Sequence, residues 1–166
     1  MCQFLKMYIP EELLLIIFQY LDPKDLLVTV QVSTSWSRIS RDPKLWQQII
    51  LTGKTIPLNI ENLNLYISQL IQMSPSLTTF RIDEYTSRKV SPHFIVKTLV
   101  EYCGNLRELG LEARGGVGLD ILDLIARNCY KSLQSLNIGI SSVETGLSSV
   151  GFLRNLSPGR IISYSL

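Results

Sequence analysis

The sequence predicts an α/β fold, in which three short N-terminal helices precede a short solenoid with parallel strands inside and helices outside. Two observations predict it. Residues 9–46 have apolar residues at helical spacing and repeated helix-start signals. The chain beyond them repeats a Leu-x-x-Leu-x-Leu pattern at starts 31, 29, 27 and 28 residues apart. We therefore expect two parts, a helical part at 9–48 and a repeat part at 49–166.

The first predicted helix, Glu11 to Leu21, is more apolar than an ordinary surface helix. At 100° per residue its apolar side chains cover an arc of roughly 200°, whereas a surface helix normally buries a stripe about half as wide. The arc contains Leu13, Leu14, Ile16, Ile17, Phe18, Tyr20 and Leu21. Roughly forty residues bury too little surface to cover such an arc by themselves. We therefore expect a partner to complete this part of the chain.

Two further helix starts combine an N-cap acceptor with a proline at the first helical position, at Asp22-Pro23 and at Asp42-Pro43. A third helix is predicted to begin after Ser33. Apolar residues at helical spacing follow these starts, at Leu26, Leu27, Val30, Trp36 and Ile39. We expect three large side chains to join the helices to one another and to the first repeat: Trp36, Leu45 and Trp46.

The same segment resembles a known family, the F-box. The resemblance is carried by Ile9, Pro10, Glu12, Ile17, Phe18, Leu21, Asp25, Leu26, Val32, Trp36, Asp42, Pro43, Leu45 and Trp46. Ile9 stands where leucine is commoner in the family. The resemblance implies that the partner is the small Skp adaptor, which links F-box proteins to a cullin–RING ubiquitin ligase. The alternative is a helical cap on a repeat domain.

The adaptor-binding face and its support are expected on the first two helices. The predicted residues are Ile9, Pro10, Glu12, Leu13, Ile17, Phe18, Leu21, Leu26, Leu27 and Val30.

The repeated pattern has three strong copies and two weaker ones. They are Leu77, Phe80, Ile82; Leu106, Leu109, Leu111; Leu133, Leu136, Ile138; and, more weakly, Trp46, Ile49, Leu51 and Ile161, Tyr164, Leu166. Segments with helical spacing lie between the copies, around residues 63–71, 95–100 and 122–126. The pattern and its length indicate about four to five leucine-rich repeats, each with a strand in a parallel sheet and a helix on the convex side. The last copy ends with the sequence, so we expect an incomplete C-terminal repeat.

The sequence has three cysteines, Cys2, Cys103 and Cys129, and their spacing matches no disulfide framework. We expect reduced thiols and a location in the cytoplasm or nucleus. Cys103 and Cys129 close two predicted repeat helices, which resembles the cysteine-containing class of leucine-rich repeats. We expect both thiols to be buried.

The candidate substrate-binding residues alternate with the apolar strand residues, because successive side chains of a strand point to opposite faces. The predicted exposed face carries Thr79, Arg81, Asp83, Glu108, Gly110, Glu112, Ser135, Asn137 and Gly139. The alternative is that these are merely solvated strand positions, since the face is mixed in charge and lacks an aromatic anchor.

Several activities fit the sequence poorly. The net charge of +2 is spread over both halves, without the basic patch of nucleic-acid binding. Thr52-Gly53-Lys54-Thr55 resembles the end of a phosphate-binding loop, but Gln48 stands where that motif needs its first glycine, so we expect a turn there. His93 has no neighbouring cysteine to share a metal. We expect no enzyme, no metal, no cofactor and no membrane span.

An F-box followed by such repeats resembles the substrate receptors of Skp–cullin–F-box ubiquitin ligases. The resemblance implies a subunit without catalysis of its own, which positions a protein substrate near the charged conjugating enzyme. One alternative is a truncated scaffold or competitor that occupies the Skp adaptor without delivering substrate. Another is a fragment with no independent role.

Overall fold

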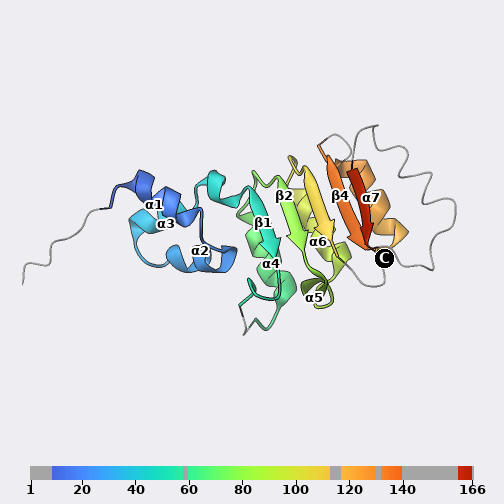
Figure 1. Cartoon of the computed structure of the whole chain (residues 1–166), viewed down its shortest axis with the longest axis horizontal. Coiled ribbons are helices and arrows are strands. Elements are labelled where there is room, and N and C mark those ends of the chain that lie inside the picture. The colour runs from blue at the N-terminus through green and yellow to red at the C-terminus, as the bar shows by residue number, and fades with distance from the viewer. Residues whose placement is uncertain (1–8, 58–59, 113–116, 130–131, 140–160, 166) are drawn as a thin grey trace, which may run out of the picture.

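The structure is a computed structural model, and it describes residues 9–57, 60–112, 117–129, 132–139 and 161–165. Figure 1 shows an elongated molecule with a group of short helices at the N-terminal end and a sheet beside it. Among the described residues, the long helices that follow the strands all lie over the rear face of that sheet. The predicted order of helices first and parallel strands second is confirmed.

The helical unit, residues 9–46, contains α1 (Glu11–Phe18), α2 (Pro23–Thr29), α3 (Thr34–Ser40) and the 3-10 helix η1 (Pro43–Trp46). Ser33 Oγ accepts a hydrogen bond from the Trp36 N–H at 3.2 Å, and Asp42 Oδ1 accepts one from the Lys44 N–H at 2.9 Å. These two caps match the predicted starts. Asp22 precedes α2 as predicted, but its side chain makes no capping bond.

The first helix is shorter than predicted. It ends at Phe18 and not at Leu21. The next backbone N–H groups, of Tyr20 and Leu21, donate to the carbonyls three residues before them. Such tighter turns are common at helix ends, and Pro23 keeps the preceding residue out of helical geometry. Tyr20 and Leu21 therefore leave the helix in a turn.

The sheet unit, residues 48–139 and 161–165, contains five parallel strands in chain order. The strands are β1 (Gln48–Leu51), β2 (Thr79–Ile82), β3 (Glu108–Leu111), β4 (Ser135–Gly139) and β5 (Ile161–Ser165). The helices α4 (Leu63–Gln72), α6 (Pro92–Tyr102) and α7 (Leu119–Cys129) follow β1, β2 and β3. A short helix α5 (Glu84–Ser87), which the sequence pattern does not predict, follows β2.

The strand register agrees with the repeats for four copies. Ile49 pairs with Phe80, Phe80 with Leu109 and Leu109 with Leu136. The fifth copy differs, because Tyr164 pairs with Ile138 and not with Leu136. The register of the fifth copy is therefore shifted by two residues from the one that the repeat predicts. The assignment of these units to leucine-rich repeats stays a prediction.

The core of the sheet unit lies between the strands and their helices. Strand residues such as Ile49, Leu51 and Leu111 are fully buried. Cys103 and Cys129 are buried and unpaired, as predicted, whereas Cys2 lies outside the described residues. Burial, together with the nearby Cys129, raises the pKa of the Cys103 thiol to about 11. That thiol donates to the Ser74 carbonyl at 3.6 Å, so it is a packed, protonated group.

Candidate functional site

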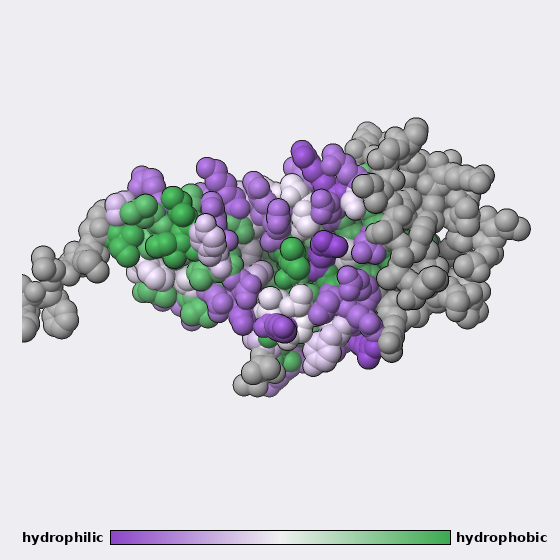
Figure 2. Space-filling view, viewed as in Figure 1, coloured by the Kyte–Doolittle hydropathy of each residue, from purple (hydrophilic) through white to green (hydrophobic). Residues whose placement is uncertain are grey.

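The helical unit carries an exposed apolar surface, which we call the α1–α2 face. Leu13, Ile16 and Ile17 on α1 are 51%, 50% and 49% exposed. We include in it the other exposed large apolar side chains of the unit, which are Ile9, Tyr20, Val28 and Val32. Figure 2 shows hydrophobic surface gathered over this end of the molecule. Single exposed apolar side chains are common, but a group of them in one small unit marks an interaction site.

The predicted adaptor-binding residues divide by burial. Ile9, Pro10, Glu12, Leu13 and Ile17 are exposed, and Leu21, Leu27 and Val30 are partly buried. Phe18 and Leu26 are in the core, at 1% and 3% exposure, so a partner does not reach them in this conformation. The Phe18 ring packs edge-on against Trp36, with centroids 5.1 Å apart and planes at 70°. Phe18 and Leu26 therefore support the face rather than form it.

The predicted set omits four exposed apolar residues: Ile16, Tyr20, Val28 and Val32. For Ile16 and Tyr20 the signal is the width of the apolar arc on the first helix, since an arc too wide for one helix must leave some members uncovered. Tyr20 is 86% exposed because it follows the early end of α1. The α1–α2 face is therefore broader than predicted.

Contacts between α1 and α3 hold the face in place. Arg38 of α3 forms an ion pair with Glu11 of α1, and Ser35 Oγ donates to the same carboxylate at 3.2 Å. Between α2 and α3, the hydroxyls of Thr29 and Ser40 are hydrogen-bonded at 2.5 Å. These bonds fix α1 and α2 relative to α3, so the apolar side chains are held in one arrangement before any partner binds.

Trp46 joins the helical unit to the first strand. Its side chain is 1% exposed, and its Nε1–H donates to the Ser40 carbonyl at 2.6 Å. Trp46 also belongs to one buried cluster with Leu14 of α1 and Ile49 of β1, which fits its predicted role at the junction. Tyr66 of α4 reaches the same region, where burial and the carboxylates of Asp25 and Asp22 raise the pKa of its hydroxyl to about 12. The two units are thus packed together through large side chains.

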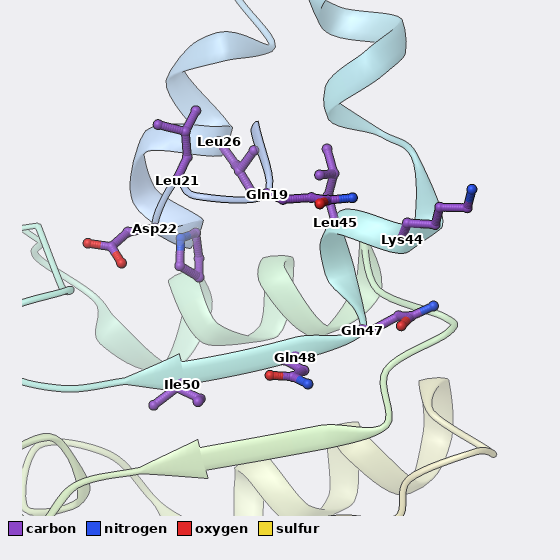
Figure 3. Close-up of a pocket in the computed structure, with 10 residues that line it drawn as sticks. Gln19, Leu21, Asp22, Leu26, Lys44, Leu45, Gln47, Gln48 and Ile50 are labelled. Carbon is purple, nitrogen blue, oxygen red and sulfur yellow. The ribbon is translucent and has the colours of Figure 1, made fainter. Parts of the chain in front are cut away.

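A cavity of about 280 Å³, which we call the junction cavity, lies between the helical unit and β1. Figure 3 shows Leu21, Leu26 and Leu45 on the helical side, and Gln48 and Ile50 on the strand. Its remaining lining residues are Gln19, Asp22, Pro23, Lys44 and Gln47. Gln48 and Ile50 are the two exposed residues of β1, so the cavity is continuous with the exposed face of the sheet.

The predicted substrate-binding residues do not all lie free on that face. Arg81 and Glu108 are exposed, and Glu112, Ser135 and Asn137 are partly buried. Thr79 is only 8% exposed, contrary to the prediction, because it is short and has Gln48 and Glu108 beside it on both neighbouring strands. Gly110 is buried, and the burial of Gly139 lies outside the described residues. The face available to a partner is therefore centred on Arg81 and Glu108.

Asp83 is engaged within the structure. Its Oδ1 accepts a hydrogen bond from the Thr86 N–H at 2.9 Å, which caps α5, and its Oδ2 accepts one from the Gly53 N–H at 3.0 Å. Partial burial opposes the charged form, but the hydrogen bonds from Thr86 and Gly53 outweigh it and lower the pKa of Asp83. Its carboxylate thus holds two loops together, and a role for Asp83 in substrate binding stays a prediction.

The segment Thr52–Thr55, which resembles the end of a phosphate-binding loop, forms the predicted turn. The Thr55 N–H donates to the Thr52 carbonyl at 3.0 Å, and the Gly53 N–H is taken by Asp83. In the described part of the chain, no three His, Cys, Asp or Glu residues are grouped to hold a metal. Within those same residues, no helix is long and apolar enough to cross a membrane.

Comparison with known proteins identifies the N-terminal part. The F-box-like family model matches residues 7–52, which includes the whole helical unit and β1. The chain is also similar to the Rho GTPase-activating protein gacFF of Dictyostelium discoideum, with 40% identity over 42 residues. That match covers 25% of this chain and 5% of the Dictyostelium protein. The N-terminal helices are therefore an F-box-like domain.

Proposed function

We propose that this chain is the substrate-binding subunit of a Skp–cullin–F-box ubiquitin ligase. The α1–α2 face binds the Skp adaptor, and the exposed face of the sheet binds a protein substrate. The observation that carries the proposal is the exposed apolar group on α1, Leu13, Ile16 and Ile17, within the segment that matches the F-box-like model.

The energetics favour a partner on this face. Completing the burial of a half-exposed Leu or Ile contributes on the order of 1 kcal/mol. Several such side chains are held in one arrangement in the free protein, so they lose little conformational entropy when the partner binds. Glu12 is exposed beside Leu13 and Ile16, and it supplies a charge at the rim that favours one orientation of the partner.

The chain's contribution to ubiquitin transfer is positional. A substrate held on the sheet face and an adaptor held on α1 and α2 are joined by the one buried cluster that contains Leu14, Trp46 and Ile49. The tether raises the effective concentration of a substrate lysine near the conjugating enzyme. In this role the chain forms and breaks no covalent bonds.

The test is binding to purified Skp adaptor by isothermal titration calorimetry. We compare the wild type with Leu13→Ala/Ile17→Ala, and with Leu65→Ala as the matched control, because Leu65 is 56% exposed but lies on α4. The double variant is expected to weaken binding at least about tenfold, and the control to leave it unchanged. If the folded wild type does not bind, or if both variants behave alike, the proposal is wrong.

A second assay separates a ligase subunit from a scaffold or competitor that merely occupies the Skp adaptor. The chain is added to a reconstituted ligase with ubiquitin, and modification of proteins captured from a lysate is measured. A substrate receptor increases modification of captured proteins in proportion to the chain added. A competitor binds the adaptor and lowers the modification directed by another receptor.

A further inference from the structure

This inference rests on the proposed function and concerns three charged side chains on the sheet face next to the junction cavity. Arg81 on β2, Glu108 on β3 and Glu112 just after β3 make no side-chain ion pair or hydrogen bond in the described part of the chain. The strand register places Arg81 opposite Gly110, between the positions of Glu108 and Glu112. The cationic group is therefore free to pair with an incoming carboxylate.

Gly110 gives Arg81 its place on the sheet. A Cβ at position 110 would lie 3.1 Å from Arg81 Cγ and 3.3 Å from Arg81 Nε. The Arg81 side chain thus lies across the backbone of β3, in the space that any other residue at 110 would fill. Its aliphatic stem packs on the strand while its guanidinium stays exposed. A side chain supported in this way loses less conformational freedom when it binds a ligand.

The junction cavity lies on the other side of Arg81. Ile50 on β1 is the register partner of Arg81, and neighbouring strands are about 4.8 Å apart. Ile50 lines the cavity together with Leu21, Leu26 and Leu45. Across the sheet, from β1 to β3, the face therefore offers the apolar side chains of a cavity of mixed polarity, then one positive charge, then two negative charges.

We propose that this face binds an extended protein segment in which alternate residues are apolar, acidic and basic. The apolar side chain enters the junction cavity, the carboxylate pairs with Arg81, and the basic side chain pairs with Glu108 or Glu112. Alternate residues of an extended segment point the same way and are about 6.6 Å apart, more than the roughly 4.8 Å between strands, so the segment would cross the strands obliquely. A guanidinium binds a carboxylate through two parallel hydrogen bonds, which fixes the position of the acidic residue.

The test uses two labelled synthetic peptides and the full chain, alone and bound to the Skp adaptor. The matched peptide has Leu, Glu and Lys at alternate positions in a serine–glycine background, in both sequence directions. The swapped peptide exchanges its Glu and Lys. Fluorescence anisotropy at low salt is expected to give about tenfold tighter binding of the matched peptide, and Arg81→Glu is expected to reverse that preference.

Two further variants complete the experiment. Gly110→Ala displaces the Arg81 stem and is expected to reduce the preference, whereas Lys97→Glu, at an exposed position of α6, is the matched charge reversal that leaves it intact. Equal binding of the two peptides, absence of binding by both, or a preference unchanged in Arg81→Glu would overturn the inference. Adaptor binding is measured on the same samples. If it persists while the peptide preference is absent, this inference fails and the adaptor proposal stands.

Discussion

The helical unit and the sheet unit use the same apolar residue types in different ways. In the sheet unit the strand residues Ile49 and Leu111 are at 0% exposure, because α4, α6 and α7 cover them. In the helical unit Leu13 and Ile17 on α1 remain half-exposed, and Tyr20 is more exposed still. The strands of the sheet unit are thus covered by its own helices, whereas the helical unit leaves a group of large apolar side chains exposed, as the proposed adaptor binding requires.

The largest effect is expected from the residue that joins the two units. Trp46→Ala removes a side chain that is 1% exposed and its hydrogen bond to Ser40, so we expect the free energy of unfolding to fall by about 3–5 kcal/mol. Urea unfolding followed by circular dichroism measures it. Trp46→Phe keeps most of the volume and is expected to lose less. A loss below about 1 kcal/mol in Trp46→Ala would show that the units are not packed together as described.

Two residues of α1 sharpen the comparison within one helix. Phe18→Ala is expected to lower the free energy of unfolding by about 3–4 kcal/mol, because Phe18 is buried against Trp36. Leu13→Ala is expected to change it by less than about 0.5 kcal/mol, because Leu13 is half-exposed. When adaptor affinity is measured on folded samples, Leu13→Ala should weaken binding, because Leu13 is expected to contact the adaptor itself. Equal stability losses would contradict the division between face and support.

A loop contact within the sheet unit gives a smaller, pH-dependent effect. The folded-state pKa of Asp83 is lowered, so its charged form stabilises the fold above its unfolded pKa of about 3.9, and this contribution disappears as the pH falls through the lower folded pKa. Asp83→Ala removes the cap of α5 and should cost about 1 kcal/mol at pH 7. Unfolding measured from pH 6 to pH 2.5 should show a smaller acid loss in Asp83→Asn than in the wild type. Identical acid curves would exclude this role.

The smallest effects are expected from surface ion pairs. Arg38→Ala breaks a pair that joins α1 and α3, and Arg127→Ala breaks an exposed pair between residues four apart in α7. We expect a loss of about 0.5–1 kcal/mol for the first and about 0.3 kcal/mol for the second. Thermal unfolding at low salt and at 1 M salt measures both, and both losses should shrink at high salt. A larger loss in Arg127→Ala than in Arg38→Ala would contradict the expected order of the two pairs.

Local sequence signals predicted the elements well. Ser33 and Asp42 predict helix starts, because their side chains cap the turn that follows. The repeated leucines predict the strands and the register between them as far as β4. These features depend on residues a few positions apart or on a regular period. The buried positions of Cys103 and Cys129 follow from the same period.

Features that depend on distant residues could not be predicted. Asp83 accepts a hydrogen bond from Gly53, thirty residues away in the sequence, and only the folded structure shows this contact. Thr79 is covered by side chains of two other strands. The support of Arg81 by Gly110 and the junction cavity also arise from tertiary packing, which no local pattern encodes.

The most direct test of the central claim is hydrogen exchange of the full chain with and without purified Skp adaptor. We expect added protection at backbone amides of α1 and α2, where the exposed apolar side chains lie, and little change in α6, which is farther from the helical unit. That result would place the partner on the α1–α2 face. Unchanged exchange in α1 and α2 at saturating adaptor, or protection confined to α4 and α6, would contradict the claim.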